Sequence, residues 1–445
     1  MESMRMKCLI IAAGKGSRLR QQGDCKPLIT ILGLSLIERV IRTAMEAGAD
    51  DFLVVTGYQE ELIRSFLVSL THRLGCSIAP IFNEDWEKEN GLSVLKAKEY
   101  LQEPFLLLMA DHLFDPSIAR ELMALALSDG EIALGVDGDT RNSSVDMEDV
   151  TRVKIKDGKI LDIGKGLTDF NGFDTGIFLC TTAIFKALER SAKQDGDITL
   201  SRAVKILAAE GKVKTLEISG RFWIDVDDPA AFRRAENSIL ANLKDKPNDG
   251  PVSRYLNRPV SIRISRRLVD HQITPNQISV FSFLCSVLAA GLFALDGYFA
   301  LLLGGLMAQF ASIVDGCDGE VARLKYQCSA YGGWFDAVLD RYADAFLLFG
   351  LTWHGYADKM DSFILLIGFM AIIGSFMLSY TADKHDSLMR DRIIHGKGLR
   401  MGRDIRVFLI FLGAVFNQAY LTLVVIAVVM NIATVRRLII CRDHG

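Results

Sequence analysis

Residues 298–323 read YFALLLGGLMAQFASIVDGCDGEVAR, an apolar run that ends in carboxylates. The apolar part approaches the roughly 20 residues that a helix needs to cross the hydrocarbon layer of a membrane. A charged side chain inside such a segment costs about 2.5–3.5 kcal/mol on insertion scales, so its presence needs a functional reason. We therefore predict a membrane-spanning helix that carries part of a site in its last turns.

Five other apolar segments accompany this one and predict an all-α membrane domain of six transmembrane helices. The six segments lie near residues 276–296, 298–321, 334–355, 361–382, 405–417 and 419–440. Most approach the length of a spanning helix, and the fifth is short. Buried helices of soluble proteins rarely occur in such a series, so the lipid bilayer is an expected partner.

Basic residues occur in alternate connectors of this series and predict its orientation. The connectors after the second, fourth and sixth segments contain Arg323, Lys325, Lys384, Arg390, Arg392, Lys397, Arg400, Arg403, Arg406, Arg436, Arg437 and Arg442. In the opposite connectors, Lys359 is the only basic residue. Because positively charged connectors stay on the cytoplasmic side, we expect both termini of this cell-membrane protein in the cytoplasm.

The chain before these segments alternates short apolar strands with helical patterns. The expected strands cover residues 7–12, 51–56, 77–82, 105–110 and 132–136, and the expected helices include 36–47 and 59–71. This alternation predicts an α/β domain with a mostly parallel, Rossmann-like sheet. Ligands of such sheets bind at the carboxyl ends of the strands.

A polar segment, LKDKPNDGP at residues 243–251, is the expected linker between domains 1–242 and 252–445. The second domain begins with arginines interleaved with apolar residues over 252–270, a pattern that suits a helix lying at the membrane surface. A net charge of −3 argues against nucleic acid as a partner. The eight cysteines contain no CxxC pair, so neither a disulfide framework nor a metal finger is expected.

Four aspartates lie at the ends of the second and third apolar segments and predict a metal site. Asp315 and Asp318 are three residues apart, and Asp336 and Asp340 are four apart, so each pair lies on one helix face. Like charges at this range repel by about 4 kcal/mol at an effective dielectric near 20. The neighbouring arginines are too few to neutralise these and the adjacent carboxylates. A divalent cation with oxygen ligands would remove the repulsion.

The spacing of these residues resembles the signature of the CDP-alcohol phosphotransferase family. The pattern D-x2-D-G-x2-A-R-x8-G-x3-D-x3-D is matched at every fixed position from Asp315 to Asp340. Just before the first span, Thr274-Pro275-Asn276 resembles a second motif of the family. The resemblance implies that Thr274 and Asn276 help to bind the substrate.

The same resemblance implies roles for the other motif residues. The ligands of Mg²⁺ or Mn²⁺ would be Asp315, Asp318 and Asp336, joined by Asp340. Asp340 would also be the catalytic base that takes the proton of the acceptor alcohol. Gly319 and Arg323 would contact the nucleotide of the CDP-alcohol substrate, and the cations would hold its diphosphate.

The first strand runs into the turn Gly14-Lys15-Gly16-Ser17-Arg18, which is neither a Walker A loop nor a dinucleotide-binding GxGxxG turn. By itself this turn is a weak sign of phosphate binding. Followed by Lys26-Pro27-Leu28, it resembles the sugar-nucleotidyltransferase family. That resemblance implies that Gly14 and Gly16 cradle the nucleotide triphosphate, while Arg18 and Lys26 act on its phosphate charge as catalytic residues.

Residues at later strand ends extend this second resemblance. Asp111 would bind a metal ion, and the second ligand would be Asp227 or Asp225, with Asp227 preferred. Contacts to the base and to the phosphorylated acceptor would come from Ser93, Lys165 and Asp174. Taken singly, each of these three residues is better explained by ordinary surface or turn chemistry. The implied reaction is attack of a phosphate monoester on the α-phosphorus of CTP.

One half would thus make an activated alcohol, and the other would consume a CDP-alcohol. This fusion resembles the family of bifunctional inositol-1-phosphate cytidylyltransferases and di-inositol-phosphate-phosphate synthases. The resemblance implies that CTP and inositol 1-phosphate give CDP-inositol and pyrophosphate. CDP-inositol and a second inositol 1-phosphate would then give di-inositol phosphate phosphate and CMP. Inositol is implied by the fusion alone and by no residue.

Two alternatives remain open at this point. The first is a phospholipid synthase whose N-terminal domain supplies its CDP-alcohol. The second is a transporter with a regulatory nucleotide-binding domain, which predicts polar residues near the middle of the bilayer rather than at the cytoplasmic helix ends. The sequence leaves the oligomeric state open, a homodimer included.

Overall fold

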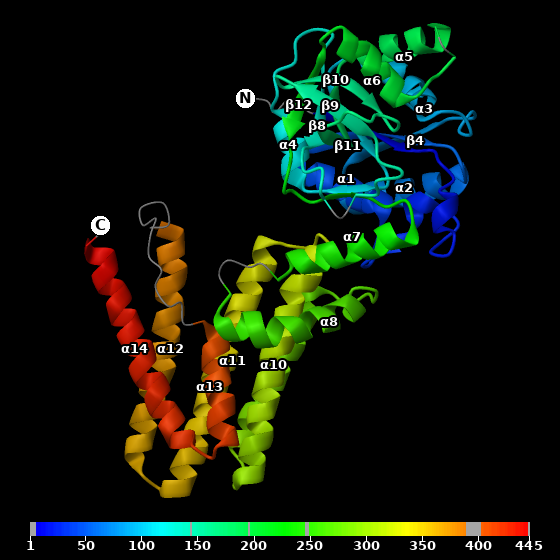
Figure 1. The fold of residues 1–445 in the computed structure, drawn as a ribbon. Coiled ribbons are helices and arrows are strands. Elements are labelled where there is room, and N and C mark those ends of the chain that lie inside the picture. The colour runs from blue at the N-terminus through cyan, green and yellow to red at the C-terminus, as the bar shows by residue number, and fades with distance from the viewer. Residues whose placement is uncertain (1–5, 143–144, 195, 245–248, 389–401, 444–445) are drawn as a thin grey trace. The chain divides into compact units, whose positions relative to one another are not determined.

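The computed structural model describes residues 6–142, 145–194, 196–244, 249–388 and 402–443. The chain forms two compact units, residues 1–239 and 240–445. The first is built around a nine-stranded sheet, and the second consists of helices (Figure 1). Each unit has its own apolar core.

The sheet of the first unit has the strand order β5-β4-β1-β6-β11-β8-β12-β10-β9. Its strands are β1 (Met6–Ala12), β4 (Ala49–Thr56), β5 (Ser77–Phe82), β6 (Phe105–Met109), β8 (Ile132–Asp137), β9 (Arg152–Lys156), β10 (Lys159–Gly164), β11 (Gly172–Cys180) and β12 (Val213–Glu217). Strands β5, β4, β1 and β6 are mutually parallel, whereas β11 is antiparallel to β6 and β8. The expectation of a mostly parallel α/β sheet is confirmed.

Helices cover both faces of this sheet (Figure 1). One group comprises α1 (Leu36–Ala47), α2 (Glu60–Leu74) and α4 (Pro116–Met123), and the other α3 (Asn90–Lys96), α5 (Ala183–Gln194) and α6 (Leu200–Ala209). Helix α1 has the predicted bounds because its two ends are capped. The Ser35 side chain accepts a hydrogen bond from the Glu38 amide, and Gly48 ends the helix at a φ of 118°. The last helix of this part is α7 (Pro229–Asn242).

Two small antiparallel ribbons complete the first unit. One pairs β2 (Thr30–Ile31) with β3 (Leu34–Ser35), and the other pairs β7 (His112–Phe114) with β13 (Trp223–Asp225). In the second ribbon His112 lies opposite Asp225. The Trp223 indole donates a 2.8 Å hydrogen bond to Asp137 at the end of β8. The ribbon therefore brings the segment after Asp111 against a segment more than a hundred residues later.

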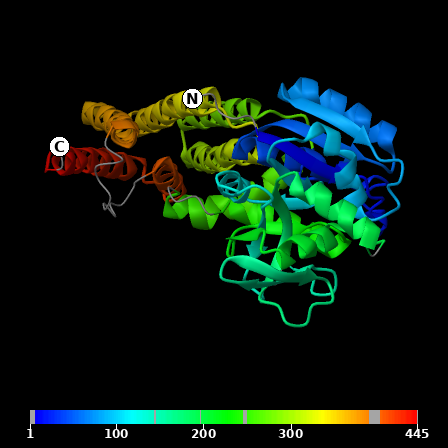
Figure 2. The same ribbon diagram turned by 90° about the horizontal axis from the view of Figure 1, so that it is seen from above.

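In the parts that the structure describes, the second unit contains a π-helical turn at Ser253–Asn257, the short helix α8 (Arg258–Leu268) and six further helices. These are α9 (Pro275–Phe293), α10 (Tyr298–Leu324), α11 (Ala330–Lys359), α12 (Ser362–Leu388), α13 (Arg403–Val415) and α14 (Ala419–Asp443). Helices α12 and α14 lie side by side in both views (Figures 1 and 2). Among the described residues, four helical segments are long and apolar enough to cross a membrane, namely 275–293, 298–324, 362–384 and 419–440. The membrane domain is helical as expected, and the number of six spans stays a prediction.

Candidate active sites

The glycine-rich loop after β1 lies directly against Lys26. Gly16 has a φ of +59°, and a Cβ at this position would lie 2.3 Å from the Lys26 Cβ. Both features require glycine. A cavity of about 300 Å³ lies beside the loop, with a lining that includes Gly14, Gly16, Ser17, Arg18, Lys26, Asp111 and Asp227. The structure therefore brings together the loop, both predicted cations and two predicted metal ligands.

Carboxylates hold both of these cations. Lys26 is buried and forms ion pairs with Asp111 and Asp227. Burial lowers the pKa of Lys26, but the two negative charges outweigh this effect and keep its pKa above the ordinary value. Arg18 lies 2.7 Å from Asp149 and 3.4 Å from Asp227. The first cavity thus contains one ammonium group and one guanidinium group, and a substrate phosphate could replace the carboxylates as their partner.

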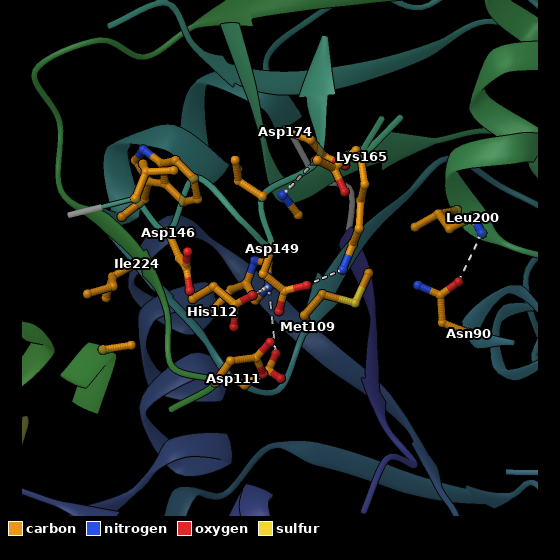
Figure 3. A pocket seen from close by; sticks show the side chains of 18 of the residues that line it. Asn90, Met109, Asp111, His112, Asp146, Asp149, Lys165, Asp174, Leu200 and Ile224 are labelled. Carbon is orange, nitrogen blue, oxygen red and sulfur yellow. Dashed lines mark hydrogen bonds and ion pairs between the residues drawn. The ribbon is translucent and has the colours of Figure 1, made fainter. Parts of the chain in front are cut away.

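A second cavity, of about 330 Å³, shares Gly14, Asp111 and Asp227 with the first. Figure 3 shows Lys165 and Asp174 among the side chains that line it. Lys165 pairs with Asp149, and this hydrogen bond is the main reason that the pKa of Asp149 falls to about 2. Burial raises the pKa of Asp174 to about 6. The two residues predicted to hold the acceptor therefore lie in one cavity next to the phosphate loop.

His112 extends the acidic cluster and was not singled out from the sequence. Its Nε2 lies 3.4 Å from Asp225 and 3.8 Å from Asp111. Burial lowers the pKa of His112, but the charge of Asp225, with smaller contributions from Asp111 and the Thr175 carbonyl, raises it to about 10 overall. The only sequence signal was its position directly after Asp111.

Ser93 is buried and is absent from the described lining of both cavities. Its hydroxyl accepts a 3.0 Å hydrogen bond from the Asn83 amide group. In the same helix, the Asn90 side chain accepts a 2.9 Å hydrogen bond from the Leu200 amide at the start of α6. These contacts order the segment that contains Ser93, and its predicted contact with the base stays a prediction.

The membrane aspartates gather between α10 and α11. Carboxylate oxygens of Asp315, Asp336 and Asp340 all lie within 4.8 Å of one another. Serines of α9 orient the α10 pair. Ser279 donates a 2.6 Å hydrogen bond to Asp318, and Ser282 donates a 3.1 Å hydrogen bond to Asp315. The helix faces expected from the i, i+3 and i, i+4 spacings therefore meet.

An arginine of α13 completes this cluster. Arg403 Nη1 lies 2.7 Å from both Asp315 Oδ2 and Asp340 Oδ1. Asp344 is buried and pairs with Arg406 at 2.6 Å and with Arg403 at 3.3 Å. From the sequence, Arg403 and Arg406 were noted only among the positively charged residues of the connectors, and no role in the site was predicted for them. Their i, i+3 spacing at the start of an apolar segment was the signal for a shared inward face.

The remaining motif residues occupy defined places around the cluster. Glu320 is fully buried and accepts 2.6 Å hydrogen bonds from Arg258, Ser261 and Ser265. This carboxylate is therefore neutralised by α8 rather than by a metal. The Nη2 atom of Arg323 is buried and has no hydrogen-bond partner among the described residues. It is thus available to donate a hydrogen bond to a substrate oxygen, and its predicted contact with the nucleotide stays a prediction.

The two substrate-binding residues predicted before the first span begin α9. Thr274 and Gln277 form a reciprocal capping box, which accounts for Thr274 by local structure. Asn276 reaches the start of α11, because a Cβ on Gly332 would lie 3.5 Å from its Oδ1 atom. Gly319 donates its amide to Asp318. Gly319 thus contacts one of the predicted metal ligands directly, whereas Asn276 lies beside the first turn of α11.

Both acidic clusters fit a divalent cation. The Oδ1 atoms of Asp225 and Asp336 are buried and have no hydrogen-bond partner within the described parts of the chain. A buried carboxylate oxygen without a partner is costly, and a cation satisfies it. The donor sets are three aspartates in the second unit and two aspartates with one imidazole in the first. Oxygen and imidazole donors of this kind are typical ligands of divalent cations.

Comparison with known proteins assigns both units. Residues 8–212 match the MobA-like NTP transferase domain, and residues 272–439 match the CDP-alcohol phosphatidyltransferase family. The bifunctional IPC transferase and DIPP synthase of Rubrobacter xylanophilus is 36% identical over 97% of this chain and 95% of its own length. The protein of the same description from Aquifex aeolicus is 33% identical, with 96% of both chains covered. The solved inositol-1-phosphate CTP transferase from T. maritima is 27% identical, with a TM-score of 0.46, over 52% of this chain and 93% of that one.

Proposed function

The chain belongs to the family of bifunctional IPC transferases and DIPP synthases, and we propose that its two units catalyse consecutive reactions. The first unit converts CTP and inositol 1-phosphate to CDP-inositol and pyrophosphate. The second converts CDP-inositol and another inositol 1-phosphate to di-inositol phosphate phosphate and CMP. The observation that carries this conclusion is the match of single bifunctional relatives over nearly the whole length of both units.

In the first reaction, a phosphate oxygen of inositol 1-phosphate forms a bond to the α-phosphorus of CTP. The bond between that phosphorus and the oxygen leading to the β-phosphate breaks, and pyrophosphate leaves. Lys26 and Arg18 stabilise the phosphate charge, because they lie beside the glycine-rich loop in the first cavity. Lys165 and Asp174 position the acceptor from the adjoining cavity, Lys165 at its phosphate and Asp174 at its hydroxyl groups.

In the second reaction, a hydroxyl oxygen of inositol 1-phosphate attacks the phosphorus that bears inositol in CDP-inositol. The bond from this phosphorus to the bridging diphosphate oxygen breaks, and CMP leaves. Asp340 accepts the hydroxyl proton, since its carboxylate lies within the aspartate cluster at the end of the helices. Arg323 and Gly319 meet the nucleotide from α10, and Asn276 meets it from the start of α9.

Mg²⁺ is the proposed cofactor of both units, with Mn²⁺ as a substitute. Asp315, Asp318, Asp336 and Asp340 would hold it in the second unit, and Asp111 with Asp225 or Asp227 in the first. When bound, a divalent cation supplies positive charge to the diphosphate and to the leaving oxygen. Asp225 and Asp336 each have a buried carboxylate oxygen that lacks a hydrogen-bond partner among the described residues, which supports a cation at both sites.

We further propose six spans, from α9 to α14, with both termini on the cytoplasmic side. Helix α11 has 30 residues and is long enough to cross, although it carries the catalytic aspartates. Helix α13 has 13 residues, a length of about 20 Å, and would need thinning of the bilayer or a neighbouring turn to cross. The arrangement puts both reactions in the compartment that contains CTP.

A substrate panel tests the proposal. Purified protein with CTP, Mg²⁺ and inositol 1-phosphate should release pyrophosphate first and CMP afterwards, and CDP-inositol should appear as an intermediate. Other phosphorylated alcohols serve as controls for specificity. Release of CMP only when a lipid alcohol is added would instead support a phospholipid synthase.

A further inference from the structure

The imidazole of His112 is held in one orientation by the backbone. Its Nδ1 lies 2.7 Å from the carbonyl oxygen of Thr175. A carbonyl oxygen only accepts hydrogen bonds, so Nδ1 carries a proton and donates it. A histidine that ligates a metal usually gives its other ring N–H to a carbonyl or carboxylate in this way, which fixes the tautomer and aims the free nitrogen.

The second ring nitrogen, Nε2, faces the two carboxylates of the first unit and gives up its proton when it binds a cation. Nε2 lies 3.4 Å from Asp225 Oδ2 and 3.8 Å from Asp111 Oδ1. One ligand atom from each of these three residues lies within 4.8 Å of the other two, a separation that one cation with ligand bonds of about 2.0–2.6 Å can bridge. The other oxygen of Asp225 is buried and lacks a hydrogen-bond partner among the described residues.

The backbone next to Thr175 leaves room for this ring. Gly176 has a φ of +73°, and a Cβ there would lie 2.3 Å from His112 Nδ1. Any other residue at 176 would push the imidazole away from Asp225. The segment 174–176, which contains the predicted acceptor-binding residue Asp174, therefore also fixes His112.

Asp227 is engaged differently from Asp225. Its two carboxylate oxygens pair with Lys26 and Arg18, whereas Asp225 lies opposite His112 in the β7–β13 ribbon. The geometry therefore favours Asp225 over Asp227 as the partner of Asp111.

We propose that His112 ligates, through Nε2, the divalent cation of the cytidylyl-transfer site together with Asp111 and Asp225. This inference rests on the proposed function of the first unit. An imidazole ligand favours first-row transition ions over Mg²⁺, which prefers oxygen. The first site therefore discriminates more strongly for Mn²⁺ or Co²⁺ than the second site, whose cluster contains only carboxylates.

Pulsed electron paramagnetic resonance of Mn²⁺ bound to the full-length protein tests the assignment without relying on activity. The echo of the wild-type protein should carry the modulation of a directly bound imidazole nitrogen. His112→Gln should remove this modulation, and Asp225→Asn should weaken Mn²⁺ binding at the same site. His72→Gln, at an exposed position of α2, is the matched control and should leave the modulation unchanged.

Metal dependence of pyrophosphate release gives a second measurement. His112→Gln should raise the Mn²⁺ concentration needed for half-maximal release by at least about tenfold, and the Mg²⁺ concentration by less. His112→Lys separates a ligand from a positive charge that only neutralises the two aspartates. If the lysine variant keeps the wild-type Mn²⁺ dependence, the charge role is correct and the ligand role is overturned.

The outcomes also separate this inference from the proposed function. A wild-type protein that makes CDP-inositol but whose bound Mn²⁺ shows no nitrogen modulation overturns the His112 assignment alone. A wild-type protein that makes no CDP-inositol with either metal overturns the proposed function itself. The decisive measurement uses the wild-type chain, so the proposal can be tested even if a variant fails to fold.

Discussion

Each of the two acidic clusters brings several carboxylates close together, and a cationic side chain offsets their repulsion in each, a lysine in one and an arginine in the other. In the first unit, Lys26 sits between Asp111 and Asp227. In the second, Arg403 sits between Asp315 and Asp340. Each cluster thus contains one long cationic side chain that bridges two carboxylates. In both units the bridged carboxylates include proposed metal ligands, so a bound metal ion would compete with the lysine or the arginine for them.

The difference lies in where the bridging cation comes from. Lys26 comes from the segment next to the glycine-rich loop, and the absence of a Cβ at Gly16 lets the two pack together. Arg403 comes from a helix that begins more than sixty residues after Asp340. Lys26 is therefore part of the predicted phosphate-binding motif, whereas only helix packing brings Arg403 to its cluster. Each cluster takes its cation and its carboxylates from its own unit, so we expect the two sites to work independently, and experiments can test this expectation.

The strongest test of independence is Asp111→Ala. We expect CDP-inositol synthesis to fall to background, because the variant lacks a metal ligand and the main partner of a buried lysine. CMP release from supplied CDP-inositol should be unchanged, since that chemistry uses only the second unit. Pyrophosphate and CMP are measured in parallel, with exposed Asp129→Ala as the control. Loss of both activities in a folded variant would show that the sites are coupled.

Asp340→Asn tests the division of labour within the second cluster. Transfer should slow by roughly two to four orders of magnitude, the usual range for a lost general base. Binding of CDP-inositol should stay close to normal, because the other aspartates still hold the cation. Asp318→Asn is the matched comparison and should weaken CDP-inositol binding, with partial recovery at high Mg²⁺.

A metal titration of both variants decides the role of Asp340. If Asp340→Asn loses nucleotide binding as severely as Asp318→Asn and recovers with metal, Asp340 acts chiefly as a ligand. The base would then be another group.

The sequence predicted the local elements and the aspartate faces of the two sites, but it did not predict which distant side chains pair with them. The bounds of α1 and the parallel strands followed from local hydrophobic periodicity, which acts over a few residues. The faces of Asp315/Asp318 and Asp336/Asp340 followed from helical spacing. Arg403 and His112 could not be assigned this way, because their partners are set by helix packing and by the β7–β13 ribbon.

Arg403→Gln sharpens the comparison of the two bridging cations. Removing the guanidinium leaves Asp315 and Asp340 without their competing partner, so the second site should bind Mg²⁺ more tightly. If the displaced pairs are worth about 1.5 kcal/mol, the Mg²⁺ requirement of CMP release should fall about tenfold. Arg406→Gln is the contrasting variant: it breaks the buried pair with Asp344, so it should lower stability by about 3–5 kcal/mol without that metal effect. An unchanged Mg²⁺ requirement in Arg403→Gln would mean that Arg403 does not compete with the cation.

The smallest expected effect concerns Asp149, which holds both Arg18 and Lys165 in the first unit. These two cations are more than half exposed, so each pair is worth only about 0.2–1 kcal/mol. Asp149→Asn removes a carboxylate that competes with substrate phosphate for both cations, so the KM for CTP and for inositol 1-phosphate should each fall by about two- to fivefold. The kcat should change little, because the side-chain ion pairs of Asp149 in the described structure are with Arg18 and Lys165 rather than with Lys26. Steady-state pyrophosphate release measures both constants, and Asp169→Asn, which removes an exposed partner of Lys154, is the control. A rise in KM would show instead that Asp149 orders the two cations for the substrate, and the carboxylates of the first unit would then assist phosphate binding rather than compete with it.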